Sequence, residues 1–451
     1  MSYTLSKNSQ KSLYEQLYEQ IKQDILCGRL SHGEKLPSKR SIAENSGVSL
    51  VTVENAYAQL IAEGYVKARE RSGYYVHFSG EAFPVNTAKP AALPIFEERS
   101  DIALEKPDDN AFPFTVWARL MRSVILEKGS AILRPVRNGG AEELCTALSD
   151  YLYRARGFYV PPEQIIVGSG TEYLYNLLIQ LFGRDKCVGV ENPGYEKLPK
   201  IYELNGVKCE HIELDDEGMS IEALAKSSVD IAHISPAHHY PTGIVMPISR
   251  RLAIMNWAEQ KSGRYIIEDD YDSEFRWGGK PVPTMFGMDS GGRVVYINTF
   301  SLTIAPSVRI SYMCLPNELY KLWHKRLGFY SCSVPSFEQY TLARFISEGY
   351  FERHINRTKK RYRRVREKVL RLVESFGNAV TTSEENAGLH FTMTIYSEAA
   401  VIIPLCESCG LRVTPLSEYY RNPEEAPRGS YIVNYHSADE EKLAKALASR
   451  L

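Results

Sequence analysis

The chain of 451 residues lacks any apolar run that approaches the roughly 20 residues of a membrane-spanning helix. Its first residues, Met-Ser-Tyr-Thr-Leu-Ser-Lys-Asn, lack the apolar core of a signal peptide. An excess of one charge is also missing, because 54 Lys and Arg stand against 55 Asp and Glu, a net charge of −1. We therefore expect a cytoplasmic protein with no membrane partner, and a chain coated throughout in positive charge is excluded.

Cysteine is sparse, and closely spaced cysteines are nearly absent. Of the eight cysteines, only Cys406 and Cys409 form a Cys-x-x-Cys pair. Neither a second pair nor a His-x-x-x-His completes the four ligands of a zinc site. Because cytosolic cysteines are mostly packed thiols, we expect no metal site and no redox role.

What the chain does contain is ordinary for a soluble globular protein, with 44% apolar and 24% charged residues. Its length predicts two to four domains, at roughly 100–200 residues each. Residues 1–80 carry ten Lys or Arg and eight Asp or Glu, so their net charge is +2, while the remainder carries −3. This asymmetry fits a small anion-binding module attached to a larger, mildly acidic one.

The first 80 residues predict three helices. Apolar residues at every fourth position indicate a helix over 11–26, with Gly28 as its C′ residue. Ser38 and Ser49 are N-cap candidates for two further helices, the second of which runs to about Ala62. Two short helices joined by a Gly-containing turn form a helix-turn-helix. The predicted apolar face of the third helix consists of Val53, Ala56, Tyr57, Leu60 and Ile61.

A β-hairpin with a basic tip is predicted to follow. Two strand-like runs, Tyr65-Val66-Lys67 and Tyr74-Tyr75-Val76, flank a turn that holds Arg69, Arg71 and Gly73. The domain is expected to span residues 1–78. Residues 79–105 contain three prolines and little periodicity, and we interpret them as a linker.

From residue 106 to residue 451 the pattern becomes one of strands that alternate with helices. Repeated strand–loop–helix units predict an α/β body with a mostly parallel sheet, covered by helices on both faces. Ligands of such sheets bind outside the carboxyl ends of the strands, and polar clusters stand at those ends. The predicted strands are Ile165–Val167, Cys187–Val190, Ile231–Ile234, Arg264–Ile267 and Val294–Ile297.

The stretch Leu13–Val76 resembles the winged helix-turn-helix of the GntR family of bacterial regulators. The strongest match is Gly33-Glu34-Lys35-Leu36-Pro37-Ser38-Lys39-Arg40, followed by Gly47-Val48-Ser49 and Thr52-Val53. A recognition helix of this kind docks in the major groove of double-stranded DNA. Four polar residues of the third helix can reach base edges, and four cations can neutralise phosphates; these are Ser49, Thr52, Asn55 and Gln59, and Lys39, Arg40, Arg69 and Arg71. For a lone charged residue a solvated face is the default explanation, but here helix, turn, helix and wing follow in order.

One position departs from the GntR pattern. The family often has Arg directly after the Ser that starts the recognition helix, whereas this chain has Leu50. The operator sequence therefore cannot be transferred from relatives.

Residues 106–451 resemble the fold-type I aminotransferases, which use pyridoxal 5′-phosphate (PLP). Fused to a GntR-type head, the whole chain resembles the MocR subfamily of transcription regulators. The resemblance implies a phosphate-binding turn at Ser169-Gly170-Thr171, although a glycine-rich turn alone can be only a tight connection. In Asn192-Pro193-Gly194-Tyr195, the tyrosine matches the aromatic residue that stacks on the cofactor ring; the alternative is a loop tyrosine packed on its own turn.

Two further motifs complete the implied cofactor site. In the run Glu268–Trp277, Asp269 matches the carboxylate that pairs with the pyridine nitrogen, and Tyr271 matches the residue that bonds the phenolic oxygen. In the run Thr299–Arg309, three residues match the clamp on the cofactor phosphate, namely Thr299, Ser301 and Arg309.

The same run departs from the family at Leu302, where the resemblance places the lysine that forms the Schiff base. Leucine can neither form an imine nor shuttle a proton, so we expect no aminotransferase activity and only non-covalent binding of PLP. Ile432 stands where many aminotransferases have the Arg that holds the substrate carboxylate. Substitutes for that Arg could be Lys197, Arg412, Arg421 or Arg428, and nothing in the sequence selects one.

These observations predict a DNA-binding transcription regulator whose body senses a small molecule, which could be PLP, a preformed pyridoxal–amine adduct or another phosphorylated compound. The resemblance implies a homodimer, which would present two heads to two half-sites. Two alternatives stay open: a PLP-dependent aminotransferase with an accessory DNA-binding head, and a scaffold whose body only dimerises.

Overall fold

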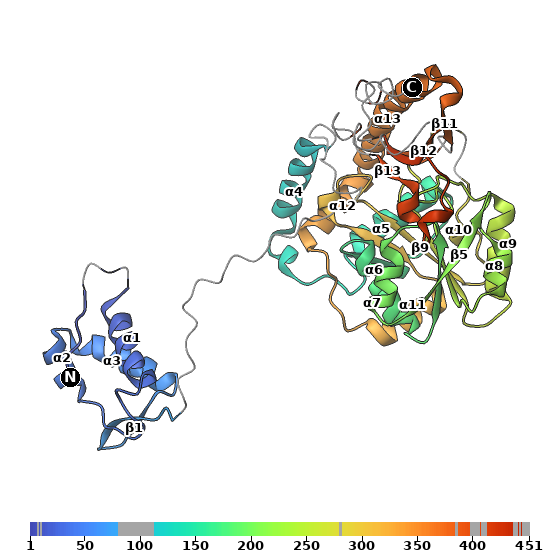
Figure 1. Ribbon diagram of the computed structural model, residues 1–451. Coiled ribbons are helices and arrows are strands. Elements are labelled where there is room, and N and C mark those ends of the chain that lie inside the picture. Colours follow the sequence, from blue (N-terminus) through green and yellow to red (C-terminus); the bar gives the residue numbers. More distant parts are fainter. Residues whose placement is uncertain are drawn as a thin grey trace. The chain divides into compact units, whose positions relative to one another are not determined.

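A computed structural model describes residues 1–6, 9, 11–79, 112–278, 282–383, 387–396, 406, 413–435, 441 and 443. The chain divides into two compact units, Met1–Glu97 and Glu98–Leu451, and each is described by itself (Figure 1). Apart from Ser79, the predicted linker lies outside the described residues, as do Cys409 and Arg412. Among the described helices, none is long and apolar enough to cross a membrane.

The first unit, here called the head, is a three-helix module with a hairpin. Its helices pack their apolar faces on one core, and the two strands pair in an antiparallel register that aligns Val66 with Val76. The elements are α1 (Leu13–Leu26), α2 (Lys39–Ser46), α3 (Leu50–Ala62), β1 (Val66–Arg69) and β2 (Gly73–Val76).

The predicted caps of the head are confirmed. The Ser38 hydroxyl accepts the backbone N–H of Ser41 at 3.2 Å, and the Ser49 hydroxyl accepts that of Thr52 at 3.2 Å. Gly28 has a φ of +77°, as expected for a C′ glycine. The prediction that Ile61 joins the core is wrong, because its side chain is 36% exposed. At 100° per residue it stands at the edge of the apolar stripe of α3, beyond Tyr57.

The second unit, here called the body, is built on an eight-stranded sheet with the order β3-β10-β9-β8-β7-β4-β5-β6. The five strands from β9 to β5 run parallel, whereas β10 and β6 are antiparallel to their neighbours, so the predicted mostly parallel sheet is confirmed. The strands are β3 (Ile165–Gly168), β4 (Cys187–Asn192), β5 (Lys208–Asp215), β6 (Gly218–Met219), β7 (Ile231–Ile234), β8 (Tyr265–Asp269), β9 (Val294–Thr299) and β10 (Ser311–Cys314).

Helices cover both faces of this sheet, as predicted. Residues that alternate along the strands separate the two faces, so that Ile166 packs with α6, α7 and α11 while Val167 packs with α5 and α12. The helices are α4 (Phe114–Lys128), α5 (Glu142–Arg156), α6 (Thr171–Phe182), α7 (Lys197–Leu204), α8 (Ile221–Lys226), α9 (Ile248–Glu259), α10 (Met285–Met288), α11 (Asn317–Leu327), α12 (Ser336–Ser347) and α13 (Tyr350–Ser375).

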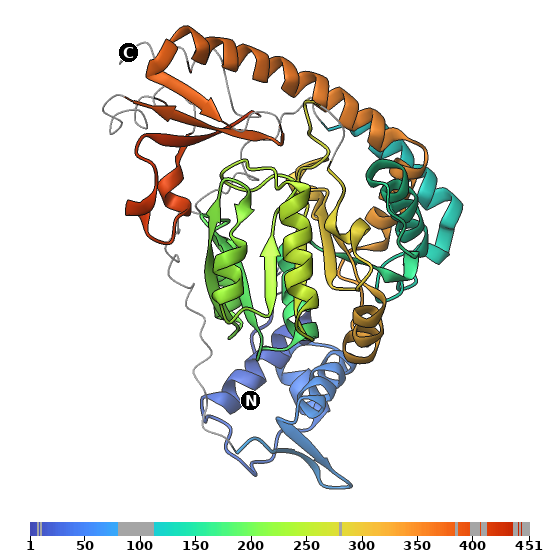
Figure 2. The ribbon, with the colours of Figure 1, turned by 90° about the vertical axis from the view of Figure 1, so that its right-hand side faces the viewer.

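A second sheet lies near the C-terminus. It is antiparallel, with the order β11-β12-β14-β13, and it packs on the last part of α13. Figure 2 shows α13 as a long helix along the outer side of the body, with this sheet at one of its ends. The strands are β11 (Val380–Ser383), β12 (His390–Ile395), β13 (Thr414–Pro415) and β14 (Ser430–Asn434).

Candidate functional site

The predicted ligand residues gather at one edge of the large sheet because several strand ends meet there. The antiparallel strand β10 begins at Ser311, which pairs with Gly168 at the end of β3 on one side and with Thr299 at the end of β9 on the other. In the next strand, Asp269 ends β8 and pairs with Ile297. Residues that follow β3, β8 and β9 therefore share the carboxyl edge, where ligands of such sheets bind.

The Ser169–Thr171 turn meets Arg309 at this edge. Gly170 precedes α6 with a φ of +103°, and a Cβ atom on it would lie 2.6 Å from Nη2 of Arg309. Only glycine lets the guanidinium come this close to the first turn of the helix. The pairing of a cation with a helix N-terminus is suited to an anion such as a phosphate. The Ser169 N–H, by contrast, donates to the Ser333 hydroxyl at 3.1 Å.

Hydroxyl groups form the adjoining part of the edge. The Ser311 hydroxyl donates to Oγ1 of Thr299 at 2.8 Å, and the backbone N–H of Ser301 donates to the same oxygen at 3.2 Å. The Thr299 hydroxyl in turn donates to Oγ of Ser301 at 3.2 Å. Thr299 and Ser301, two of the residues predicted to clamp the phosphate, thus bond each other, and Ser311, which that prediction did not include, lies beside them.

A carboxylate lies between two cations at this end of the site. Glu172 is 3.5 Å from Nη2 of Arg309 and 3.3 Å from Nζ of Lys197. Burial, followed by repulsion from Arg309 and Lys200, lowers the pKa of Lys197. Lys197, one of the candidates for holding a substrate carboxylate, therefore lies at the phosphate end. The other described candidates, Arg421 and Arg428, are exposed.

Asp269 is the buried acidic residue of the site. Its side chain is 7% exposed, and its Oδ2 accepts a short hydrogen bond from the hydroxyl of Tyr175. The Nε2 atom of His233 lies 3.4 Å from the same oxygen. The Tyr202 hydroxyl bonds Nδ1 of His233 at 2.8 Å, an arrangement that leaves the proton on Nε2 to face Asp269.

The second carboxylate oxygen of Asp269, Oδ1, is buried and has no hydrogen-bond partner among the described residues. An unpaired buried acceptor is costly, so a donor from a ligand is the natural complement. A protonated pyridine nitrogen is such a donor, and the residues present therefore fit the ring of PLP. The sequence singled out Asp269 but not Tyr175 or His233, which read as ordinary members of an amphipathic helix and a buried strand.

Aromatic side chains line the loops above the edge. Tyr195 is half-buried, with its ring 6.2 Å from that of Tyr240, whose hydroxyl bonds that of Tyr419 at 2.6 Å. The hydroxyl of Tyr271 lies 3.3 Å from Nδ1 of His238. Burial is the main cause that raises the pKa of both Tyr195 and Tyr271, so that both phenols stay protonated at neutral pH.

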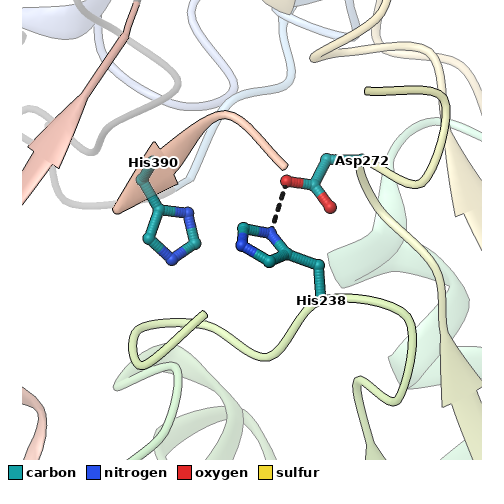
Figure 3. A group of neighbouring side chains, drawn as sticks. All are labelled: His238, Asp272 and His390. Carbon is teal, nitrogen blue, oxygen red and sulfur yellow. Dashed lines mark hydrogen bonds and ion pairs between the residues drawn. The ribbon is translucent and has the colours of Figure 1, made fainter. Parts of the chain in front are cut away.

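A buried cluster of His238, Asp272 and His390 joins these loops to the small sheet (Figure 3). Nδ1 of His238 and Oδ2 of Asp272 are 2.8 Å apart, and the backbone N–H of Leu389 donates to the same oxygen at 3.1 Å. The rings of His238 and His390 lie with their centroids 4.4 Å apart and their planes tilted by 44°. Two histidines and a carboxylate can ligate a metal, but the shared oxygen of Asp272 is committed to two N–H groups. We interpret the cluster as a structural contact that holds these loops against β12.

In the head, the structure places most of the predicted DNA contacts on its surface. Arg40, Asn55, Gln59, Arg69 and Arg71 are exposed, and Arg71 takes a φ of +56° at the tip of the hairpin. The remaining ones are more engaged: Lys39 lies 3.4 Å from Glu54, and the hydroxyls of Ser49 and Thr52 bond each other at 2.8 Å.

Two apolar residues at the start of α3 were not predicted as contacts. Leu50, which replaces the frequent Arg, is 41% exposed, and Val51 is 61% exposed. Leu302 and Ile432, the two departures in the body, are respectively half-buried in the turn after β9 and fully buried in β14.

Comparisons with known proteins agree with this division of the chain. Residues 13–76 match the family of bacterial regulatory proteins called gntR, and residues 105–448 match aminotransferase class I and II. The chain is 37% identical over 419 residues to the helix-turn-helix transcriptional regulator YdeL of Bacillus subtilis, covering 91% of this chain and 90% of that protein. It is also 30% identical to the probable rhizopine catabolism regulatory protein MocR of Rhizobium meliloti, covering 99% and 94%.

The chain belongs to the MocR-type GntR regulators. A further relative of this MocR-type regulator is the pyridoxine biosynthesis regulator PdxR of Corynebacterium glutamicum, 29% identical over 98% of this chain and 96% of that one. Among solved structures, an archaeal alanine:glyoxylate aminotransferase superposes with a TM-score of 0.66 at 23% identity, covering 76% and 87%. This likeness shows that the body has the fold of the PLP-dependent transferases of type I.

Proposed function

We propose that this chain is a DNA-binding transcription regulator whose body senses PLP, or a related phosphorylated pyridine, held without a covalent bond. The observation that carries the proposal is the buried Oδ1 of Asp269, which has no hydrogen-bond partner in the described part of the chain and lies at the same sheet edge as the Gly170–Arg309 contact. One feature suits a pyridinium N–H and the other suits a phosphate, and PLP carries both groups.

Each part of the site has its own task in this proposal. Asp269, held by Tyr175 and His233, keeps the ring nitrogen protonated, and Tyr195 supplies an aromatic wall. Arg309, the turn at Gly170 and the hydroxyls around Thr299 bind the phosphate. The relative PdxR is named for pyridoxine biosynthesis, which favours a ligand of the vitamin B6 type.

The proposal makes the body a sensor and not an aminotransferase because of Leu302. PLP supplies an aldehyde that reacts with amines. The half-buried leucine side chain in the turn after β9 has no amine. Lys197 lies beside Glu172 at the phosphate end. The alternative of an aminotransferase with an accessory head would need an amine next to the aldehyde.

In the head, α3 is proposed to enter the major groove and the hairpin to lie along the adjacent backbone. Thr52, Asn55 and Gln59 recur at spacings of three and four, so they share one face of α3. The exposed Val51 adds an apolar surface that can contact the methyl group of thymine. A homodimer of bodies would present two heads, and ligand binding would alter how the pair engages DNA.

The DNA-binding part is tested with full-length protein and double-stranded DNA selected by the protein from a random pool. We expect Arg40→Ala and Arg71→Ala to weaken binding to all sequences, each lowering the salt slope by about one unit. Asn55→Ala should relax sequence preference instead. Lys11→Ala is the control, because this cation pairs with Glu19 on α1 and lies outside the predicted surface. Unchanged DNA affinity in all three variants would contradict the assignment.

A further inference from the structure

Helix α13 of the body carries an unusual charge. Its 26 residues contain ten Lys or Arg and three Glu, a net charge of +7. Residues 98–451 together carry −2, so that the body without α13 carries −9. A single helix thus concentrates the positive charge of an otherwise acidic unit, and the sequence prediction of DNA contacts did not include it.

The cations of α13 form a stripe along one face. At 100° per residue, Arg353, Arg357, Lys360, Arg364 and Arg371 fall within a sector of about 60°. All five side chains are exposed. The opposite face is apolar and buried, with Phe351, Ile355, Val369 and Val373 packed on the body. At 1.5 Å per residue the stripe is about 27 Å long. Figure 2 shows the helix along the outer side of the body.

This stripe has little internal compensation. Arg353 and Arg371 donate to backbone carbonyl groups, of Glu348 and Glu367, and Arg357 contacts the ring of His354. For Lys360 and Arg364, the described part of the chain provides no ion pair. Glu352, one of the three acidic residues, pairs with Arg154 of α5. Like charges at spacings of three and four repel each other and destabilise a helix, so an external polyanion is the natural complement.

We propose that the exposed stripe of α13 is a second DNA-contacting surface, which binds the sugar–phosphate backbone without reading sequence. The proposal rests on DNA binding by the head, which brings a duplex to this chain. Duplex DNA is a rod with one negative charge per ~1.7 Å, so a stripe of about 27 Å can face several phosphates. Neutralising them releases counterions, which makes the contribution strongly salt-dependent.

The test compares full-length protein with a variant that carries Arg353→Gln, Arg357→Gln, Lys360→Gln and Arg364→Gln. The matched control carries Lys200→Gln, Lys226→Gln, Lys261→Gln and Lys321→Gln, four exposed lysines that each pair with a carboxylate. Both variants lose four positive charges. Binding to a mixed-sequence duplex several helical turns long is measured by fluorescence anisotropy over a range of salt concentrations.

We expect the α13 variant to reduce the magnitude of the slope of log K against log salt by up to about 3.6 units, since each of the four phosphate contacts contributes about 0.9. The control should change the slope by less than about one unit. A third variant, with Arg353→Lys, Arg357→Lys and Arg364→Lys, keeps the charge and should keep the slope. Thermal unfolding of all variants verifies that α13 stays folded.

The outcomes separate this inference from the proposed function. If wild-type protein binds DNA and the α13 and control variants have equal slopes, the inference is wrong, and the stripe serves an acidic protein partner or solvent. If Arg40→Ala and Arg71→Ala leave affinity unchanged while the α13 variant loses it, the head assignment is wrong and the stripe stands. If wild-type protein binds no DNA, both are wrong.

Discussion

The guanidinium of Arg309 lies against the backbone of Gly170, where a Cβ atom would come within 2.6 Å of Nη2. Arg309 itself has a φ of +48°, in the left-handed region of backbone conformation that residues other than glycine rarely adopt. The strand register explains the contact, since Ser311 pairs with Gly168 and so brings the start of β10 next to the end of β3. This contact places the Arg309 guanidinium next to the first turn of α6, at the anion-binding end of the site.

Substitution at Gly170 should therefore act like loss of the arginine. We expect both Gly170→Ala, which displaces the guanidinium, and Arg309→Ala to weaken binding of PLP and of inorganic phosphate by at least tenfold. The control is Gly157→Ala, at a glycine with a φ of +76° and open space around it, which strains the backbone without touching the site. Isothermal titration calorimetry decides; equal affinities in Gly170→Ala and Gly157→Ala would refute the predicted role.

Asp269 should distinguish a pyridine from a simple anion. Asp269→Ala removes the acceptor for the ring nitrogen, so PLP binding should weaken by about tenfold to a hundredfold, corresponding to about 1–3 kcal/mol. Inorganic phosphate, which has no ring, should be weakened much less. Tyr175→Phe should give a smaller loss for PLP, because the Asp269 side chain that accepts from the ring nitrogen is still present. Equal losses for PLP and phosphate would mean that no ring is recognised.

Introducing an amine at position 302 should restore covalent attachment. In Leu302→Lys, the new side chain starts from the turn after β9, next to the strand that ends at Asp269. Proximity strongly favours reaction with a bound aldehyde, since effective molarities reach on the order of 10⁵ M. After borohydride treatment, mass spectrometry should find PLP on the peptide with position 302. Turnover need not follow, because Ile432 occupies the place of the carboxylate-binding Arg. A variant that binds phosphate without covalent PLP would count against a pyridoxal site.

Glu191 gives the body a predicted dependence on pH. This carboxyl group lies 3.5 Å from His239 and accepts the Ser235 N–H, and burial raises its pKa from 4.5 to about 8. The folded protein therefore keeps the Glu191 carboxyl group protonated at pH values where the unfolded chain, in which the pKa of this group is 4.5, has already released the proton. Stability should fall as pH rises from 4.5 to about 8, by at most about 1.4 kcal/mol per pH unit.

Chemical denaturation at several pH values tests this dependence. Glu191→Gln, which is neutral at all pH values, should reduce the loss of stability between acidic and basic pH. Glu268 and Glu274, whose pKa values burial raises to about 7, leave a residual slope of the same sign. Glu196→Gln, at an exposed carboxylate that pairs with Lys200, is the control. Identical slopes in Glu191→Gln and wild type would show that Glu191 is ionised when folded.

Local signals predicted much of this structure. Caps such as Ser38 and Ser49, and apolar strands such as Ile231–Ile234, carry their information within a few residues. The strand β5 was missed because most of its residues are polar and they keep no strict alternation, so it lacks the apolar run that marks the buried strands. Polar groups at strand ends were correctly placed at one edge, since the topology rule for parallel sheets needs no side-chain detail.

The partners of the site residues could not be predicted in the same way. Tyr175 lies on the buried face of α6, so the helical pattern assigns it to the core. Its hydrogen bond to Asp269 spans 94 residues of sequence. The contact between His238 and Asp272 likewise depends on Gly388, where a Cβ atom would overlap the imidazole of His238. Such contacts follow from tertiary packing alone. The basic stripe of α13, in contrast, could have been predicted from the helical spacing of its Lys and Arg residues.

The most direct test of the account is equilibrium binding of PLP to the full-length protein, followed by borohydride reduction and peptide mapping. The account predicts saturable binding of one PLP per chain, weakened by Asp269→Ala and by Arg309→Ala, and fully reversed by dialysis. It also predicts no stoichiometric adduct on any lysine. Absence of saturable binding, or a stoichiometric covalent adduct at a lysine such as Lys197, would contradict it.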